Sequence, residues 1–252
     1  PRVAICEIKS TGDVHITSST QAPFVVKGLM RPFFGIDAGK LVVDAPLVGG
    51  GFGGKARIQL EGLAYILSRK VGGRPVKLVN SREEDLVTSP GHIGLQAHVK
   101  IGADAEGKIT AMQLEYLFNS GGYADYAVNV SRAAAISCTG PYRVPNVSCD
   151  SLCVYTNLPF ATAYRGFGHI EMGFAIERGM ELLADAMHID PVTFRVINAI
   201  KAGDTTPVQS HLNQSTGDIE KCFKEVEHML GGRVGHVEQL DEDRVLVKGV
   251  SG

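Results

Sequence analysis

Alternating and helical hydrophobic patterns follow one another along the chain, and together they predict an α+β fold. Apolar residues in alternating or short continuous runs predict strands over 14–19, 41–48, 75–80 and 147–156, and a hairpin formed by 95–101 and 108–118. Helical spacing predicts helices over 24–34, 58–71, 124–137, 171–187 and 216–230, with a further helix after Asp190-Pro191. Because strands and helices are interspersed and hairpins occur among them, we expect mixed sheets with packed helices.

Two details of this pattern make local predictions. Ser81 and Glu84 have the spacing of a capping box, so a helix is expected to begin there. Within 58–71, the apolar residues at helical spacing are Leu60, Leu63, Ala64, Leu67 and Val71. The tail from residue 233 to 252 is strand-like.

A glycine-rich stretch, V-G-G-G-F-G-G-K, runs from Val48 to Lys55 between the predicted strand at 41–48 and the helix at 58–71. Glycine tolerates positive φ and lets other atoms approach the backbone closely. Amides at a helix N-terminus suit an anionic group. The pattern therefore predicts a ligand-facing loop, with a simple tight turn as the alternative.

The same stretch nearly matches a nucleotide-binding phosphate loop. Gly49, Gly54 and Lys55 fit G-x-x-x-x-G-K, but the next residue is Ala56, which has no hydroxyl to hold magnesium. Nucleotide binding is therefore the weaker interpretation.

The composition is that of an ordinary globular protein and argues against nucleic-acid binding and membrane association. The chain has 252 residues, 44% hydrophobic, and a net charge of −2, which gives no electrostatic argument for nucleic acid or an anionic membrane. No apolar run reaches the roughly 20 residues of a membrane span. The N-terminus has no signal-peptide pattern, and we expect a cytoplasmic protein.

Five cysteines are present, and their spacing does not indicate a metal site. Cys149 and Cys153 are expected on one face of a strand, without a second pair to complete a site, and no iron–sulfur pattern occurs. We expect buried, reduced thiols.

Three segments together resemble one family. They are Ser19-Thr20-Gln21, the loop from Gly49 to Lys55, and A-Y-R-G-F-G from Ala163 to Gly168. The chain resembles the molybdopterin-binding catalytic subunit of the xanthine dehydrogenase and aldehyde oxidase family, over most of its length. The resemblance implies that family's molybdenum-cofactor-binding fold, and hydroxylation of N-heterocycles or oxidation of aldehydes with oxygen from water.

The resemblance also implies roles for single residues. Gln21, Gly51, Phe52, Gly53 and Arg165 match cofactor-binding positions, with molybdenum held through the pterin dithiolene rather than by side chains. In the intact enzyme, Gly53→Val is expected to remove cofactor or activity more than it lowers fold stability, because a side chain there would fill space that the backbone and the metal ligand need.

Substrate contacts are implied at Phe167, which matches an aromatic that packs on the substrate ring, at Ala56 and at Arg132. Xanthine-oxidising members have glutamate where this chain has Ala56, so a purine substrate is not expected. The spacing from Arg132 to Arg165 differs by one residue from that of a substrate-binding arginine in the purine-oxidising members. The alternative is that Arg132 is a solvated charge on a helix.

The family's general-base glutamate has no counterpart here, so no catalytic residue is predicted within the chain. Glu171 is the alternative candidate for the general base. The other interpretation of Glu171 is a carboxylate that interacts favourably with the dipole at a helix N-terminus. We expect residues 1–230 to form the N-terminal cofactor region, divided near 120–150 if it has two subdomains, and 231–252 to begin a following segment.

The expected function is part of a molybdenum hydroxylase, and the isolated chain is expected to be inactive. The expected cofactor is molybdenum–molybdopterin, in its simple or cytosine dinucleotide form. Expected partners are the C-terminal part of the subunit and iron–sulfur and FAD domains or subunits. A non-catalytic pterin-cofactor-binding protein is the alternative.

Overall fold

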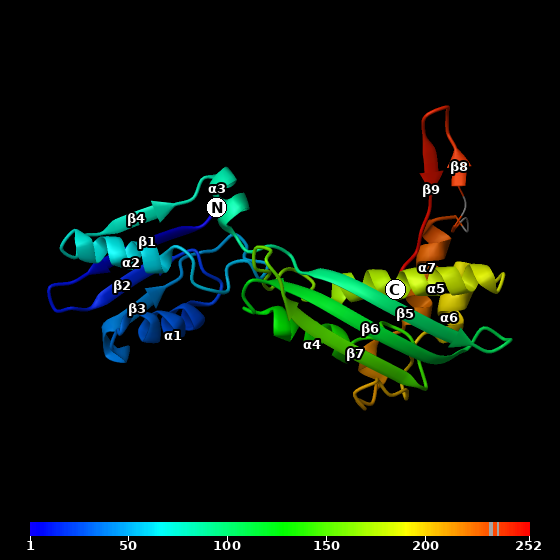
Figure 1. Ribbon diagram of the computed structural model, residues 1–252. Helices are drawn as coiled ribbons and strands as arrows, with labels where there is room; N and C mark the ends of the chain where they lie inside the picture. Colours follow the sequence, from blue (N-terminus) through cyan, green and yellow to red (C-terminus); the bar gives the residue numbers. More distant parts are fainter. Residues whose placement is uncertain (232–233, 236) are drawn as a thin grey trace. The chain divides into compact units, whose positions relative to one another are not determined.

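The computed structural model describes residues 1–231, 234–235 and 237–252, and within them the chain folds as two units (Figure 1). Unit 1 comprises Pro1–His92 and Leu158–Arg165, and unit 2 comprises Ile93–Asn157 and Gly166–Gly252. The predicted division near 120–150 falls inside unit 2. Each unit combines a sheet with packed helices, so the α+β class is confirmed.

Unit 1 is built on a four-stranded mixed sheet in the order β3-β2-β1-β4. Its strands are β1 (Val3–Ile8), β2 (Val14–Ser18), β3 (Leu41–Asp44) and β4 (Val76–Val79). β1 is antiparallel to both β2 and β4, whereas β2 and β3 are parallel. A parallel pair needs a crossover, and α1 (Pro23–Phe34) supplies it.

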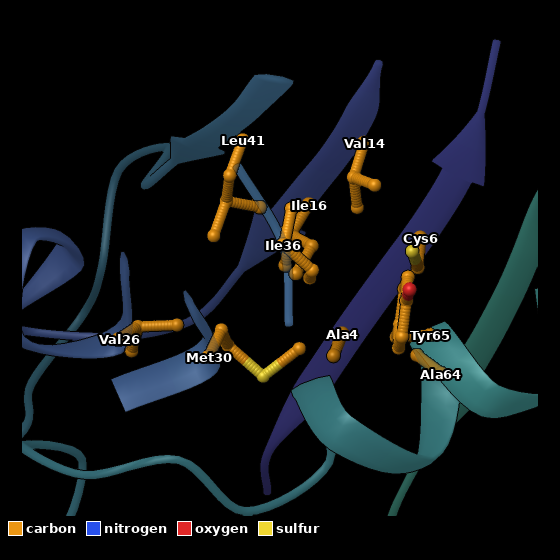
Figure 2. Close-up of a cluster of buried hydrophobic side chains, with 10 residues drawn as sticks. All are labelled: Ala4, Cys6, Val14, Ile16, Val26, Met30, Ile36, Leu41, Ala64 and Tyr65. Carbon is orange, nitrogen blue, oxygen red and sulfur yellow. The ribbon is translucent and has the colours of Figure 1, made fainter. Parts of the chain in front are cut away.

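The core of unit 1 lies between this sheet and two helices, α1 and α2 (Glu61–Lys70) (Figure 2). Alternate residues of β1 and β2 point into it, and Val26 and Met30 of α1 meet them at helical spacing. Tyr65 of α2 closes the cluster and contacts Phe34 edge to face at 5.1 Å between ring centroids. A short helix, α3 (Arg82–Thr88), follows β4 and begins with the predicted capping box of Ser81 and Glu84.

Two predictions around the glycine loop are wrong. β3 ends at Asp44 rather than continuing to Val48, and Leu47 is fully exposed. β3 is the edge of the sheet, and Pro46 lacks the N–H that a continuing ladder needs. α2 begins only at Glu61, so the loop does not lead directly into a helix N-terminus.

The face that α2 buries differs from its row of apolar residues at helical spacing. The helix buries Glu61, Ala64, Tyr65 and Ser68 and leaves Leu63, Leu67 and Val71 exposed. The polar pair can be buried because each has a partner: the Ser18 hydroxyl donates to Glu61 Oε1 at 2.5 Å, and the Ser68 hydroxyl to the Arg74 carbonyl at 2.9 Å.

Unit 2 is built on a three-stranded sheet in the order β5-β6-β7 (Figure 1). β5 (Gly94–Ala103) and β6 (Ile109–Gly121) form the predicted antiparallel hairpin, and β7 (Val147–Tyr155) runs parallel to β6 after a crossover through α4 (Ala127–Ile136). α5 (His169–Ala186) packs against β5 and α4 against β7. The remaining elements are α6 (Pro191–Asn198), α7 (Ile219–Met229), β8 (Val237–Gln239), β9 (Val245–Val247), and the short helices Ala38–Lys40 in unit 1 and Gln214–Thr216.

A buried ion-pair network joins α5 to α6. The Arg195 side chain is 2% exposed and donates to Glu177 Oε2 at 2.9 Å and to Glu181 Oε2 at 3.0 Å. The Tyr142 hydroxyl donates to Glu177 Oε1 at 2.6 Å. Such a network stabilises only as a complete set, because a lone buried charge is costly.

All five cysteines are free thiols. Cys6 and Cys138 are buried and Cys149 and Cys153 are half-buried, but Cys222 is exposed on α7, so the expectation of burial is wrong there. Burial raises the pKa of Cys6 to about 11, which keeps this thiol unreactive. Among the described residues, none of the helices has the length and apolarity for crossing a membrane.

Candidate cofactor site

Gln21 holds the glycine loop from the end of β2. Its side-chain Oε1 accepts from the amide of Gly53 at 2.9 Å and from the amide of Lys55 at 3.3 Å. The Gln21 amide donates to the Lys55 carbonyl at 3.1 Å, and the Thr20 hydroxyl donates to the same carbonyl at 3.0 Å. The first and second predicted segments are therefore one hydrogen-bonded structure.

These bonds fix the direction of the Gln21 amide. Both partners of the side chain are backbone N–H donors, so the atom that faces them must be the acceptor oxygen. The Nε2 group remains as a donor for a ligand. A polar, uncharged donor is thus presented beside the loop.

The loop itself has a strained aromatic at its centre. Phe52 has φ of 52° and its side chain is 59% exposed. Positive φ is rare for a bulky residue, and such conformations cost of order 1–3 kcal/mol and occur mostly at functional sites. Here an exposed phenylalanine is held in a conformation that neither its own backbone preference nor burial explains.

The segment Leu158–Arg165 is attached to unit 1 by backbone pairing with Gly91. The Gly91 amide donates to the Phe160 carbonyl at 3.2 Å, and the Thr162 amide to the Gly91 carbonyl at 3.1 Å. This places Ala163 against the loop: a Cβ added at Gly53, where φ is 93°, would lie 2.7 Å from the Ala163 carbonyl carbon. A side chain at position 53 would therefore occupy space that the protein backbone needs, as expected, and its effect on cofactor binding stays a prediction.

Arg165 lies over the exposed phenylalanine. Its guanidinium carbon is 5.8 Å from the centroid of the Phe52 ring, within the range of a cation–π contact. Arg165 is exposed and makes no ion pair with any residue that the structure describes. Its five N–H donors are therefore available beside the loop.

A network that the sequence did not predict fixes the other end of the loop. Arg2 donates to the Gly54 carbonyl and the Ser89 hydroxyl, and to Asp85 Oδ1 at 2.8 Å. Burial alone would raise the pKa of Asp85, but the hydrogen bond and charge of Arg2 outweigh it and hold that pKa below its usual value. Asp85 lies in α3, which the predicted capping box begins, but nothing in the sequence pattern marks Arg2.

The sequence analysis also did not predict that His92 and Tyr164 lie at this site. Their rings contact edge to face at 5.1 Å between centroids. Tyr164 belongs to the A-Y-R-G-F-G segment, which could have drawn attention to it, whereas His92 has no such signal.

The other predicted residues lie elsewhere. Ala56 follows the loop, and its residue is 8% exposed. Phe167 and Arg132 belong to unit 2: Phe167, with φ of 51°, contacts Tyr126 edge to face at 6.3 Å, and Arg132 is exposed on α4. Glu171 lies half-buried in the first turn of α5, where a negative charge suits the helix dipole.

The loop residues fit a ligand that is held by hydrogen bonds rather than by side-chain coordination. The amides of Gly50, Gly51, Phe52 and Gly54 make no hydrogen bond to the part of the chain that the structure describes. The structure also shows no cluster of three or more His, Cys, Asp or Glu side chains able to hold a metal ion among residues 1–231, 234–235 and 237–252. The amides without a partner, Gln21 Nε2 and Arg165 are therefore the groups at this loop that could donate hydrogen bonds to a bound molecule.

Comparison with known proteins identifies the family. The sequence profile of the molybdopterin cofactor-binding domain matches residues 1–199. The chain belongs to the molybdopterin cofactor-binding domain family. The resemblance to the xanthine dehydrogenase and aldehyde oxidase family is confirmed, and the site described above lies within the matched residues.

Two curated relatives indicate how much of a subunit this cofactor-binding domain spans. It is 34% identical over 224 residues to the nicotinate dehydrogenase large molybdopterin subunit of Eubacterium barkeri, covering 89% of this chain and 52% of that subunit. It is 33% identical over 211 residues to a putative xanthine dehydrogenase molybdenum-binding subunit of Escherichia coli, covering 84% of this chain and 28% of that subunit. The chain thus spans about half, or less, of these relatives.

Solved structures confirm the fold of this cofactor-binding domain. The aldehyde oxidoreductase of Desulfovibrio gigas matches with a TM-score of 0.85 and 25% identity over 91% of this chain and 25% of that one. The quinoline 2-oxidoreductase of Pseudomonas putida 86 matches with a TM-score of 0.83 and 26% identity over 91% of this chain and 30% of that one.

Proposed function

We propose that this chain forms one side of the molybdenum–pterin site in a hydroxylase of the xanthine dehydrogenase and aldehyde oxidase type. The observation that carries the proposal is the assembly of three distant segments in unit 1. Gln21 is hydrogen-bonded to the glycine loop, Gly53 packs on Ala163, and Arg165 lies over Phe52. Family membership and this assembly support the same site.

Each of these residues has a role that its contacts allow. Gln21 Nε2 donates to an oxygen of the cofactor, and the unpaired amides of Gly51 and Phe52 donate to neighbouring acceptors. Gly53 lets the loop pack tightly enough on Ala163 to keep this arrangement. Arg165 binds an anionic or carbonyl oxygen at the cofactor edge with its planar guanidinium. When bound, the cofactor supplies a redox-active metal that accepts two electrons and delivers oxygen from water to carbon.

The substrate is proposed to be an N-heterocycle or an aldehyde. The relatives' names include nicotinate dehydrogenase, quinoline 2-oxidoreductase and aldehyde oxidoreductase. Ala56 gives a substrate no hydrogen bond, so xanthine should be handled poorly in the assembled enzyme. Phe167 and Arg132 are proposed as substrate contacts.

The chain's own residues supply donors, packing and charge, but the proposed general base comes from the remaining part of the subunit. A base must reach the proton that it removes, and Gln21, Phe52 and Arg165 carry no carboxylate. The proposed partners are that remaining part and iron–sulfur and FAD components, which take up the electrons. The cofactor is proposed to be molybdopterin or its cytosine dinucleotide form, and the location cytoplasmic.

Co-expression tests the proposal. The chain is produced with a polypeptide equivalent to the rest of a relative's subunit, in a host that makes the pterin cofactor. Molybdenum content is measured by mass spectrometry, and turnover of heterocycles and aldehydes in isotopically labelled water. Stoichiometric molybdenum with label in the product supports the proposal. Cofactor without turnover would indicate a non-catalytic binding protein, and absence of both would contradict the site.

Arg165→Met provides the matched variant, and Arg178→Met, which removes an exposed charge from α5, is its control. We expect the first to lower molybdenum content at least severalfold and the second to leave it unchanged.

A further inference from the structure

A surface hollow of about 780 Å³ lies in unit 1 and shares no residue with the candidate cofactor site. It is lined by the turn between β1 and β2, by the segment that follows α1, and by the end of α2 with the turn after it. The volume is that of a pocket for a small molecule. The side chains in its lining decide which kind of molecule fits.

Tyr65 of α2 contributes an unpaired hydroxyl to the lining of this hollow. Its ring packs in the core of unit 1, and the residue is only 7% exposed (Figure 2). The hydroxyl makes no hydrogen bond with any residue that the structure describes. Because buried polar groups nearly always have a partner, this hydroxyl indicates a hydrogen-bonding position for a bound molecule.

Arg69 adds N–H donors next to this hydroxyl. Its guanidinium carbon lies 5.8 Å from the centroid of the Tyr65 ring, within the range of a cation–π contact. Within the described parts of the chain it makes no ion pair or hydrogen bond, so its five N–H donors are available. A cation in the last turn of α2 also interacts favourably with the helix dipole, but the dipole does not explain its position over the Tyr65 ring.

Lys40 contributes a second available cation. A Cβ added at Gly12 would lie 3.6 Å from Lys40 Nζ, so the ammonium reaches the turn between β1 and β2 and has no ion-pair partner among the described residues. Lys9, also in the lining, is already paired with Glu7 at 2.6 Å. The acid of the lining, Asp37, accepts a backbone amide of its own turn at 2.8 Å. Two available cations therefore accompany one carboxylate that is already hydrogen-bonded.

We propose that this hollow binds a small molecule through an oxyanion, with Arg69 and Lys40 as the charges and the Tyr65 hydroxyl as a hydrogen-bond donor. The planar guanidinium suits two oxygens of a carboxylate or a phosphate group, which share this chemistry. Phe34 contacts Tyr65 edge to face and provides an apolar wall for the carbon part of the ligand. The inference does not depend on the cofactor, because no residue is common to the two sites.

The test uses the 252-residue chain without cofactor and three probes: phenyl phosphate, benzoate and benzamide. All three have a ring, and only the first two carry an oxyanion. Binding is followed in NMR spectra by the Arg69 Nε–H and Tyr65 ring signals, with the amides of Gly50 and Gly51 as reporters of the glycine loop. We expect both anions to shift the Arg69 and Tyr65 signals, with an affinity that falls as salt is added, and benzamide to bind at least tenfold more weakly.

Variants locate the groups that bind the anion. Arg69→Met should weaken both anions at least tenfold, which is about 1.4 kcal/mol. Lys40→Met and Tyr65→Phe, which keeps the packed ring and removes only the hydroxyl, should each weaken them at least threefold. Lys70→Met is the matched control, because it removes the neighbouring cation of the same helix end, which does not line the hollow, and it should leave the affinity unchanged.

Several results would overturn the proposal: benzamide that binds as tightly as the anions, an equal loss of affinity in Lys70→Met and Arg69→Met, or shifts that are absent or confined to the Gly50 and Gly51 amides. Tighter binding of phenyl phosphate would show that the site is built for a phosphate group. Tighter binding of benzoate would show that it is built for a carboxylate, and either result supports the oxyanion site.

Discussion

Replacement of Gly53 by alanine is expected to destabilise unit 1 by about 2–4 kcal/mol. Position 53 has φ of 93°, and a conformation of this kind costs a non-glycine residue of order 1–3 kcal/mol. The new Cβ would lie 2.7 Å from the Ala163 carbonyl carbon and 3.0 Å from the Tyr164 nitrogen, so backbone must move at a cost of about 1–3 kcal/mol. Lower entropy of the unfolded chain returns only about 0.4–1 kcal/mol.

Gly49→Ala is the matched control in the same loop. A Cβ there meets no heavy atom within 4 Å, and the residue does not have positive φ. Its expected effect is below about 1 kcal/mol in either direction. The assay is urea unfolding at neutral pH, with Tyr65 and Phe34 of the unit 1 core as NMR reporters, so that unit 2 does not obscure the transition. Equal stability of the two variants would refute the packing of the loop on Ala163.

Three further predictions concern charge and ligand. Asp85→Asn should cost roughly 2–4 kcal/mol at pH 7, because Arg2 loses its nearly buried carboxylate partner. Since the pKa of Asp85 is lowered on folding, this stability is present above the unfolded value of about 3.9 and is lost as pH falls through the folded one, so the difference between the native chain and the variant should shrink with falling pH in urea titrations. Arg195→Met should lower the stability of unit 2 by about 3 kcal/mol, chiefly because Glu177, whose side chain is 13% exposed, loses its cation, whereas Arg178→Met should change it little; similar melting curves for both would contradict the network. Magnesium-ATP should show no micromolar affinity in calorimetry, because Ala56 supplies no hydroxyl and α2 begins six residues beyond Lys55; such affinity, lost in Lys55→Ala, would restore the nucleotide interpretation.

The elements that sequence predicted well are those with strong local signals. The alternation of β2, the Asp190-Pro191 start of α6 and the capping box before α3 each depend on neighbouring residues alone. The antiparallel hairpin of β5 and β6 likewise follows from alternation around a glycine-rich turn.

Errors arose where tertiary contacts override the local pattern. α2 turns Glu61 and Ser68 inward because Ser18 and the Arg74 carbonyl satisfy them, while apolar Leu63 and Leu67 face outward. The spacing of apolar residues along the helix carries no information about those hydrogen-bond partners. The return of Leu158–Arg165 to unit 1 depends on pairing with Gly91, some 70 residues earlier, which a division by sequence order could not foresee.

The candidate site shows the same contrast. Gln21, Phe52, Gly53 and Arg165 were predicted by resemblance, and the structure brings them together within unit 1. The hydrogen bond from Arg2 to the Gly54 carbonyl was not predicted, because an arginine near the start of a strand belongs to no recognisable sequence motif.

The central claim is that Gln21 holds the loop with its oxygen and the cofactor with its amide nitrogen, and Gln21→Glu separates these two roles. The variant keeps an acceptor for the amides of Gly53 and Lys55 but replaces the donor with a charged acceptor. In the co-expressed subunit, we predict that the amides of Gly53 and Lys55 stay protected from hydrogen exchange, that stability is unchanged, and that molybdenum content is at least tenfold below that of the native chain. Native molybdenum content in Gln21→Glu would contradict the claim.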